Sequence, residues 1–133
     1  MSAYLKTLVL SDSVIMDSFT GKWSIIGVSN ALVVPAIPCR APYFSAFAQV
    51  ANVGGPVVGR FQVLDPELML VYEEKTPEVN TARSGDTEFL VRFRNLVLNQ
   101  QGRHTVQFMI NDEVVGTTAL YVDMPAVPEA FGG

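Results

Sequence analysis

The sequence predicts an all-β fold: a two-sheet antiparallel β-sandwich of about eight short strands, in one domain that spans residues 1–133. Apolar and polar residues alternate along several segments, as they do in strands that have one buried face and one face in water. Short groups of turn residues separate these segments. No segment longer than about 11 residues shows helical periodicity, so we expect no helical layer.

The N-terminal half contains shorter and more apolar segments than the C-terminal half. We expect strands at residues 4–10, 22–29, 43–52, 57–64 and 68–73. The last two segments form a hairpin through Asp65-Pro66-Glu67, whose residue types favour a turn. Residues 13–16 are expected to form one helical turn at most.

The C-terminal half shows the clearest alternation, at residues 89–98, 103–111 and 114–122. The short turns between these segments indicate a three-stranded meander, and the polar segment 76–87 is expected to cross between the two sheets. One face of the last segment carries Val114, Leu120 and Val122. The chain from residue 123 onward is expected to be irregular. Short strands at this spacing are typical of an immunoglobulin-like sandwich.

The predicted core consists of large apolar side chains on the inward faces of these strands. They are Ile26, Phe47, Phe61, Phe89, Phe93, Val106, Phe108 and Leu120.

The charge of the chain argues against a nucleic-acid partner. The net charge is −4, with 9 basic and 13 acidic residues, and only Arg92 and Arg94 among the basic residues lie close together. Proteins that bind nucleic acids draw much of their affinity from clustered Lys and Arg contacts to phosphates.

The N-terminus and the cysteine content favour a soluble cytoplasmic protein. Cys39 is the single cysteine and cannot form an internal disulfide. The first residues lack the basic region and apolar stretch of a signal peptide. No apolar run reaches the roughly 18–20 residues that cross a bilayer, so we expect no membrane association.

One N-terminal loop carries the candidate structural residues Asp12, Asp17, Thr20, Gly21 and Lys22. Asp12 is expected to cap the helical turn, and Asp17 to accept hydrogen bonds from backbone amides two or three residues later. Gly21 is expected to adopt a positive φ. A phosphate-binding loop would need G-x-x-x-x-G-K-[ST] leading into a helix, whereas Lys22 leads into a strand-like segment.

Three separated motifs of the chain resemble a family of small bacterial domains of unknown function. They are Ser11-Asp12-x-Val14-x-x-Asp17-x-x-Thr20-Gly21-Lys22-x-x-Ile25-Ile26-Gly27, then Asp65-Pro66, then Gly102-x-x-x-Val106-x-Phe108-x-Ile110-x-Asp112 with a final Leu120-Tyr121-Val122. The family usually has an aromatic residue where His104 stands, and Asp-Gly where this chain has Asp112-Glu113. The resemblance implies the sandwich fold and implies no chemistry.

No motif in the sequence indicates catalysis, a cofactor or a metal. No serine lies in a G-x-S-x-G elbow, and His104 is expected to be a partly buried structural residue. One histidine and one cysteine do not suffice for a zinc site, and the acidic loops lack EF-hand spacing. A calcium-binding sandwich or an enzyme therefore ranks below a non-catalytic role.

The function that the sequence favours is a non-enzymatic binding or assembly module with a protein partner, most simply a second copy of the chain in a homodimer. The alternative is a small-ligand or carbohydrate-binding domain that uses exposed aromatic residues. Its candidate binding residues are Trp23, Tyr43, Tyr72 and Tyr121. The Gly132-Gly133 ending resembles that of ubiquitin-like modifiers, but no segment reads as the helix that their fold requires.

Overall fold

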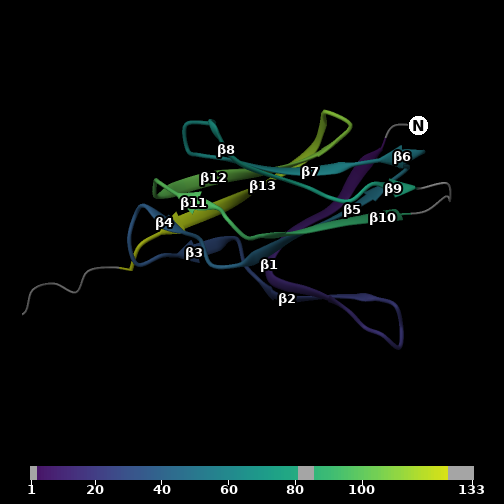
Figure 1. The fold of residues 1–133 in the computed structure, drawn as a ribbon, viewed down its shortest axis with the longest axis horizontal. Coiled ribbons are helices and arrows are strands. Elements are labelled where there is room, and N and C mark those ends of the chain that lie inside the picture. The colour runs from purple at the N-terminus through teal and green to yellow at the C-terminus, as the bar shows by residue number, and fades with distance from the viewer. Residues whose placement is uncertain (1–2, 81–85, 126–133) are drawn as a thin grey trace, which may run out of the picture.

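The computed structural model describes residues 3–80 and 86–125, which contain thirteen strands and no helix (Figure 1). The strands are β1 Tyr4–Met16, β2 Trp23–Val28, β3 Ala31–Val33, β4 Cys39–Arg40, β5 Phe44–Ala51, β6 Pro56–Val57, β7 Gly59–Leu64, β8 Leu70–Lys75, β9 Val79–Asn80, β10 Asp86–Phe93, β11 Val97–Leu98, β12 Gly102–Ile110 and β13 Glu113–Asp123. The all-β prediction is therefore correct. The expected number of strands is too low because β3, β4, β6, β9 and β11 are only two or three residues long.

The strands form one sheet of four, one sheet of five and two small ribbons. Their orders are β10-β5-β1-β2, β3-β13-β12-β7-β8, β11-β4 and β6-β9. Every pair is antiparallel except β13 with β3, which run parallel. The expectation of purely antiparallel pairing is thus wrong at β3, which reaches the edge of the five-stranded sheet through a crossover instead of a hairpin.

The inner faces of the four-stranded and five-stranded sheets share one hydrophobic core. Phe89 of β10 lies 5.1 Å from Phe108 of β12, and Phe93 lies 6.5 Å from Phe61 of β7, measured between ring centroids. Seven of the eight predicted core residues are buried, and the exception is Ile26, which is 49% exposed. Ile26 lies on the edge strand β2, where the alternate residues Trp23 and Ile25 turn inward and Ile26 turns to solvent.

The pairing of the C-terminal strands differs from the predicted meander. β12 and β13 form the expected hairpin, but β10 pairs with β5, and β12 has β7 on its other side. Residues 94–101 instead carry the chain from one sheet to the other, with β11 paired to β4 on the way. A second crossing connects β8 to β10, as predicted for segment 76–87, although residues 81–85 lie outside the described part.

A β-bulge in the β12–β13 hairpin changes which side chains of β13 face the core. The register shifts between Phe108 and Met109, so that Gly116 pairs with Phe108 and Val114 with Met109. Val115 consequently packs against the core while Val114 is exposed, which contradicts the expectation that Val114 shares a face with Leu120. Beyond the bulge, Leu120 and Val122 are buried as predicted.

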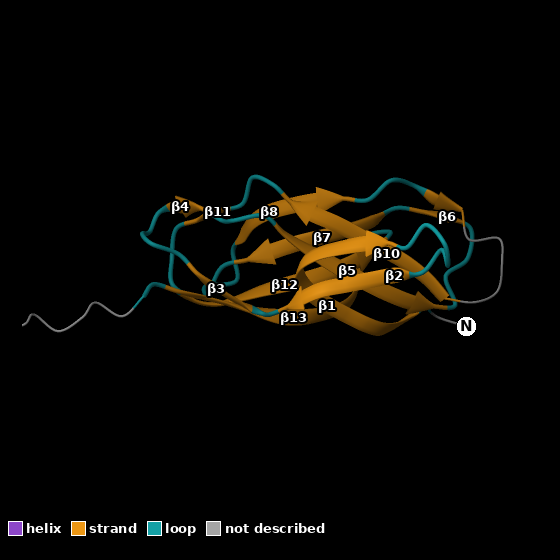
Figure 2. Cartoon of the chain, turned by 90° about the horizontal axis from the view of Figure 1, so that it is seen from below, coloured by secondary structure: helices purple, strands orange, loops and turns teal. Residues whose placement is uncertain are grey.

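The hairpin of β1 and β2 folds back over the outer face of the four-stranded sheet (Figures 1 and 2). β1 pairs with β5 up to Ser11 and with β2 from Ser11 onward. Three side chains that point away from the shared core are nevertheless buried: Ser11, Ser45 and Phe47. The side chain of Phe47 is only 6% exposed. Part of the outer face of β5 is therefore buried within the chain itself.

The N-terminal part of this hairpin contains no helical turn. Residues 13–16 belong to β1, so Asp12 does not cap a helix. Its carboxylate lies instead beside Gly27, where an added Cβ would be 2.8 Å from Asp12 Cγ and where φ is +71°.

A compact turn over residues 17–22 closes the hairpin. Asp17 Oδ1 accepts hydrogen bonds from the backbone N–H groups of Phe19 at 2.7 Å and Thr20 at 3.2 Å. The Thr20 hydroxyl accepts one from Lys22 N–H at 3.3 Å, and Gly21 has φ +68°. Asp17, Thr20 and Gly21 thus shape the turn as expected of structural residues.

Candidate functional site

The four aromatic residues expected to form a binding surface do not lie together. Tyr72 on β8 points inward and packs on Phe93, with 5.5 Å between ring centroids. Tyr43 and Tyr121 are exposed on different segments, and Trp23 is half-buried on β2. The fold thus separates them, since β2 belongs to the four-stranded sheet and β8 and β13 are not neighbours within the five-stranded sheet.

Asp65 and Asp112, two of the acidic loop residues, have partners within the chain. Asp65 Oδ1 accepts hydrogen bonds from the N–H groups of Glu67 at 2.8 Å and Met69 at 2.9 Å, and closes the β7–β8 turn. Asp112 pairs with Arg60 at 2.9 Å. Among the residues that the structure describes, no three His, Cys, Asp or Glu side chains gather into a possible metal site.

His104 is fully buried near the start of β12. Its Nδ1 lies 3.2 Å from the carbonyl oxygen of Gly102, and Leu120 is its cross-strand neighbour. This position in the core fits the structural role expected of the residue.

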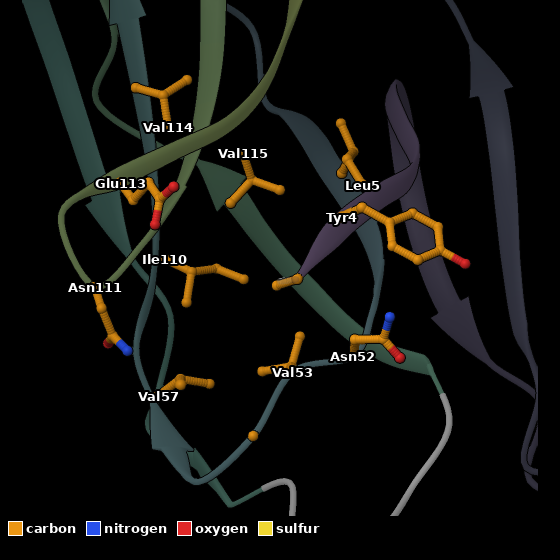
Figure 3. A pocket seen from close by; sticks show the side chains of 12 residues that line it. Tyr4, Leu5, Asn52, Val53, Val57, Ile110, Asn111, Glu113, Val114 and Val115 are labelled. Carbon is orange, nitrogen blue, oxygen red and sulfur yellow. The ribbon is translucent and has the colours of Figure 1, made fainter. Parts of the chain in front are cut away.

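A hollow of about 540 Å³, here called the end cavity, opens where β1 begins, β5 ends and β12 turns into β13 (Figure 3). Its wall is apolar and comes from three distant parts of the sequence: Leu5, Val53, Val57, Ile110 and Val115. Its rim is polar, with Tyr4 and Asn52 on one side and Asn111 and Glu113 on the other. The volume lies within the range of about 300–1,000 Å³ that small-ligand sites occupy, and the lining combines apolar side chains with polar groups.

Backbone conformations that asparagine tolerates place the two carboxamides on the rim. Asn111 and Asp112 have φ of 49° and 68°, as the central residues of a two-residue hairpin turn require. Asn52, directly after β5, has φ of 61°. These turns could be anticipated from Asn111-Asp112 and from Asn52 before Gly54-Gly55, but their meeting around one hollow could not.

The charges near the end cavity differ in how they are paired. Lys6, next to Leu5, forms an ion pair of 2.7 Å with Asp86, and this hydrogen bond raises the pKa of Lys6. Glu113 on the rim has no such partner among the described residues, and its carboxylate faces solvent. A ligand that donates a hydrogen bond would find this acceptor available.

A second hollow of about 520 Å³, here called the hairpin groove, separates the β1–β2 hairpin from the outer face of the four-stranded sheet. The hairpin contributes Met16, Gly21, Lys22 and Trp23, and the sheet contributes Phe47, Gln49 and Glu88. Three of the predicted site residues, Gly21, Lys22 and Trp23, therefore meet here with Phe47, which was predicted only as a core residue, and with Gln49 and Glu88, which the sequence did not single out.

No helix capable of crossing a membrane occurs in residues 3–80 or 86–125.

Solved structures share the fold at very low sequence identity. An alkylpurine DNA glycosylase from Pseudomonas fluorescens, bound to DNA with an abasic site analog, superposes with a TM-score of 0.60 at 8% identity. The match covers 91% of this chain and 30% of the glycosylase, so the chain corresponds to less than a third of that protein. At this identity the similarity shows the fold alone.

Two further structures match less well. An immunoglobulin-like protein from Pseudomonas aeruginosa has a TM-score of 0.41 at 11% identity, over 92% of this chain and 97% of its own. A β-glucuronidase from Bifidobacterium dentium has a TM-score of 0.38 at 12% identity, over 92% of this chain and 17% of its own.

No curated protein matches the sequence significantly. The model of one protein family does match it, over residues 6–123 and thus over nearly the whole described chain. This agrees with the resemblance carried by the Asp12-to-Gly27 and Gly102-to-Asp112 motifs. The chain belongs to DUF6941, a family of unknown function.

Proposed function

We propose that this protein is a non-enzymatic binding module on an immunoglobulin-like sandwich, and that its end cavity holds a small amphipathic molecule. Support for the sandwich comes from the core shared by the two larger sheets and from the structural similarity at a TM-score of 0.60. The observation that carries the function is the end cavity itself, whose lining combines apolar side chains with a polar rim.

The lining of the end cavity sets the chemistry of the ligand. An apolar body of a few carbons would contact Leu5, Val53 and Ile110, which contribute apolar side-chain atoms to the lining of the cavity. A polar end group would remain at the rim, where the Glu113 carboxylate accepts hydrogen bonds and the Asn52 carboxamide both donates and accepts. A short alkylammonium ion satisfies both requirements.

Thermal unfolding with hexylammonium and with hexanol tests this proposal. At about ten times its Kd a ligand stabilises the folded state by about 1.4 kcal/mol, which raises Tm by a few degrees. We expect hexylammonium to raise Tm more than hexanol, because only the ammonium group can pair with Glu113.

Two variants distinguish ligand binding in the end cavity from an effect of the overall charge of the protein. Glu113→Gln is expected to remove the advantage of hexylammonium, and Asn52→Gly to weaken both ligands while it preserves the positive φ. Glu67→Gln makes the same charge change on the exposed β7–β8 turn, at the other end of the molecule (Figure 1), and is expected to behave as wild type. Equal responses of Glu113→Gln and Glu67→Gln, or no rise in Tm with either ligand, would exclude the cavity as the site.

Self-association through the β1–β2 hairpin is the second candidate function. This hairpin exposes apolar side chains to solvent. Phe19 at its tip is 99% exposed, and Ile15 and Ile26 lie on its solvent face. Exposed apolar clusters of this kind often mark contact surfaces.

Light scattering at micromolar concentration checks this candidate. We expect the mass of a dimer, because two-fold pairing is the commonest closed symmetry, and we expect Phe19→Ser with Ile26→Ser to give the monomer mass. A wild-type protein that remains monomeric throughout the micromolar range contradicts it.

A further inference from the structure

The hairpin groove is bounded by two aromatic residues from distant parts of the sequence. Trp23 of β2 is half-buried on the hairpin side, and Phe47 of β5 forms the floor on the sheet side. No ring–ring contact joins these two residues within the described chain, and about 520 Å³ of open space borders both of them. This volume lies within the range of about 300–1,000 Å³ that small-ligand sites occupy.

Three polar side chains line the groove around Phe47 and Trp23. Gln49 and Glu88 are cross-strand neighbours on β5 and β10, so they stand side by side on the outer face of the sheet. Lys22 approaches from the hairpin turn. Within the part of the chain that the structure describes, the side chains of Gln49, Glu88 and Lys22 form no ion pair and no hydrogen bond. Together they offer an ammonium donor, a carboxylate acceptor and an amide that does both.

We infer that the hairpin groove binds a neutral sugar unit, with the pyranose ring lying against Trp23 and its hydroxyl groups bonded to Gln49, Glu88 and Lys22. The face of an aromatic ring is electron-rich and attracts the weakly positive C–H groups on the flat side of a pyranose. Sugar hydroxyls both donate and accept hydrogen bonds, which matches the mixed polar set.

The charges of the groove argue for a neutral ligand over an ionic one. Lys22 and Glu88 carry opposite charges, so their sum favours neither anions nor cations. A nucleotide phosphate would meet Glu88 and a protein of net charge −4. This site is separate from the end cavity and does not depend on the function proposed for that cavity.

Trp23 is the only tryptophan, so its fluorescence reports directly on the groove. Titration of the wild-type protein with methyl β-D-glucopyranoside, methyl β-D-galactopyranoside and cellotetraose is expected to change the emission saturably for at least one of them. Adenosine, which can also stack on an aromatic ring, serves as the comparison ligand. A saturable response to adenosine alone, or no response to any of the three sugars, overturns the inference.

Substitutions on the sheet side of the groove test the contacts without removing the fluorophore. Gln49→Ala is expected to raise the Kd for the sugar by about tenfold, since it removes a hydrogen bond to the ligand. Glu88→Gln is expected to raise the Kd as well, because it replaces a charged acceptor by a weaker neutral one. Tyr121→Ala changes an exposed aromatic on β13, away from the groove, and is expected to leave the Kd unchanged. Unfolding curves show whether each variant is folded, and unchanged Kd values in two folded groove variants would refute the site.

Discussion

Phe108→Ala is expected to lower the free energy of unfolding by about 3–5 kcal/mol. Phe108 on β12 is fully buried and touches aromatic rings of both larger sheets, with ring centroids 4.7 Å from Phe61 and 5.1 Å from Phe89. Truncation to alanine removes these contacts and leaves a cavity that packed neighbours on both sides cannot fill. Urea unfolding monitored by circular dichroism measures the loss.

The control for this substitution is Phe19→Ala, which removes the same side chain from a position that is 99% exposed. We expect it to change stability by less than about 0.5 kcal/mol, as for other surface substitutions. A loss below about 1 kcal/mol in Phe108→Ala would mean that β12 presents its other face to the core, because a shift of one residue reverses every side chain.

Gly59→Ala is expected to destabilise the protein by about 1–3 kcal/mol, even though it adds only one methyl group. An added Cβ would lie 2.7 Å from Phe89 Cδ1, 3.0 Å from Phe108 Cε1 and 3.1 Å from the Thr76 hydroxyl oxygen. The backbone cannot retreat easily, because Gly59 N–H donates to Thr76 Oγ1 at 2.9 Å and Gly59 C=O accepts from Thr76 N–H at 2.8 Å. The cost is one of packing, since φ at Gly59 lies outside the left-handed region.

Two further variants isolate this packing effect. Gly54→Ala adds a methyl group where no atom lies within 4 Å, and its stability is expected to stay close to wild type. Phe108→Leu combined with Gly59→Ala is expected to cost less than the sum of the single changes, because the smaller side chain makes room for the methyl group. Strict additivity, or a Gly59→Ala protein as stable as wild type, would show that the methyl group does not meet these rings.

The sequence alone sufficed for features that depend on local patterns. Alternation along β10 and β12 identified Phe89, Phe93, Val106 and Phe108 as core residues, because a strand with one wet face must repeat its apolar residues with a period of two. The β12–β13 turn and the left-handed conformation of Gly21 followed from residue types that tolerate positive φ.

Features that depend on partners distant in the sequence required the tertiary structure. The pairing of β10 with β5 and the bulge at Phe108 arise from contacts between segments that no local pattern connects. Phe47 on the outer face of β5 is buried, and the β1–β2 hairpin that lies over this face comes from a distant part of the sequence.

Both candidate binding sites are also features that only the tertiary structure decided. The end cavity unites Leu5, Val53 and Ile110, and the hairpin groove unites Trp23 with Phe47 and Glu88. Sequence spacing predicts which residues share a strand face, but strand order and twist determine which faces and loop ends meet. The sequence by itself thus determined most of the longer strands, several turns and most of the core, while only the packing of the sheets decided where a ligand could bind.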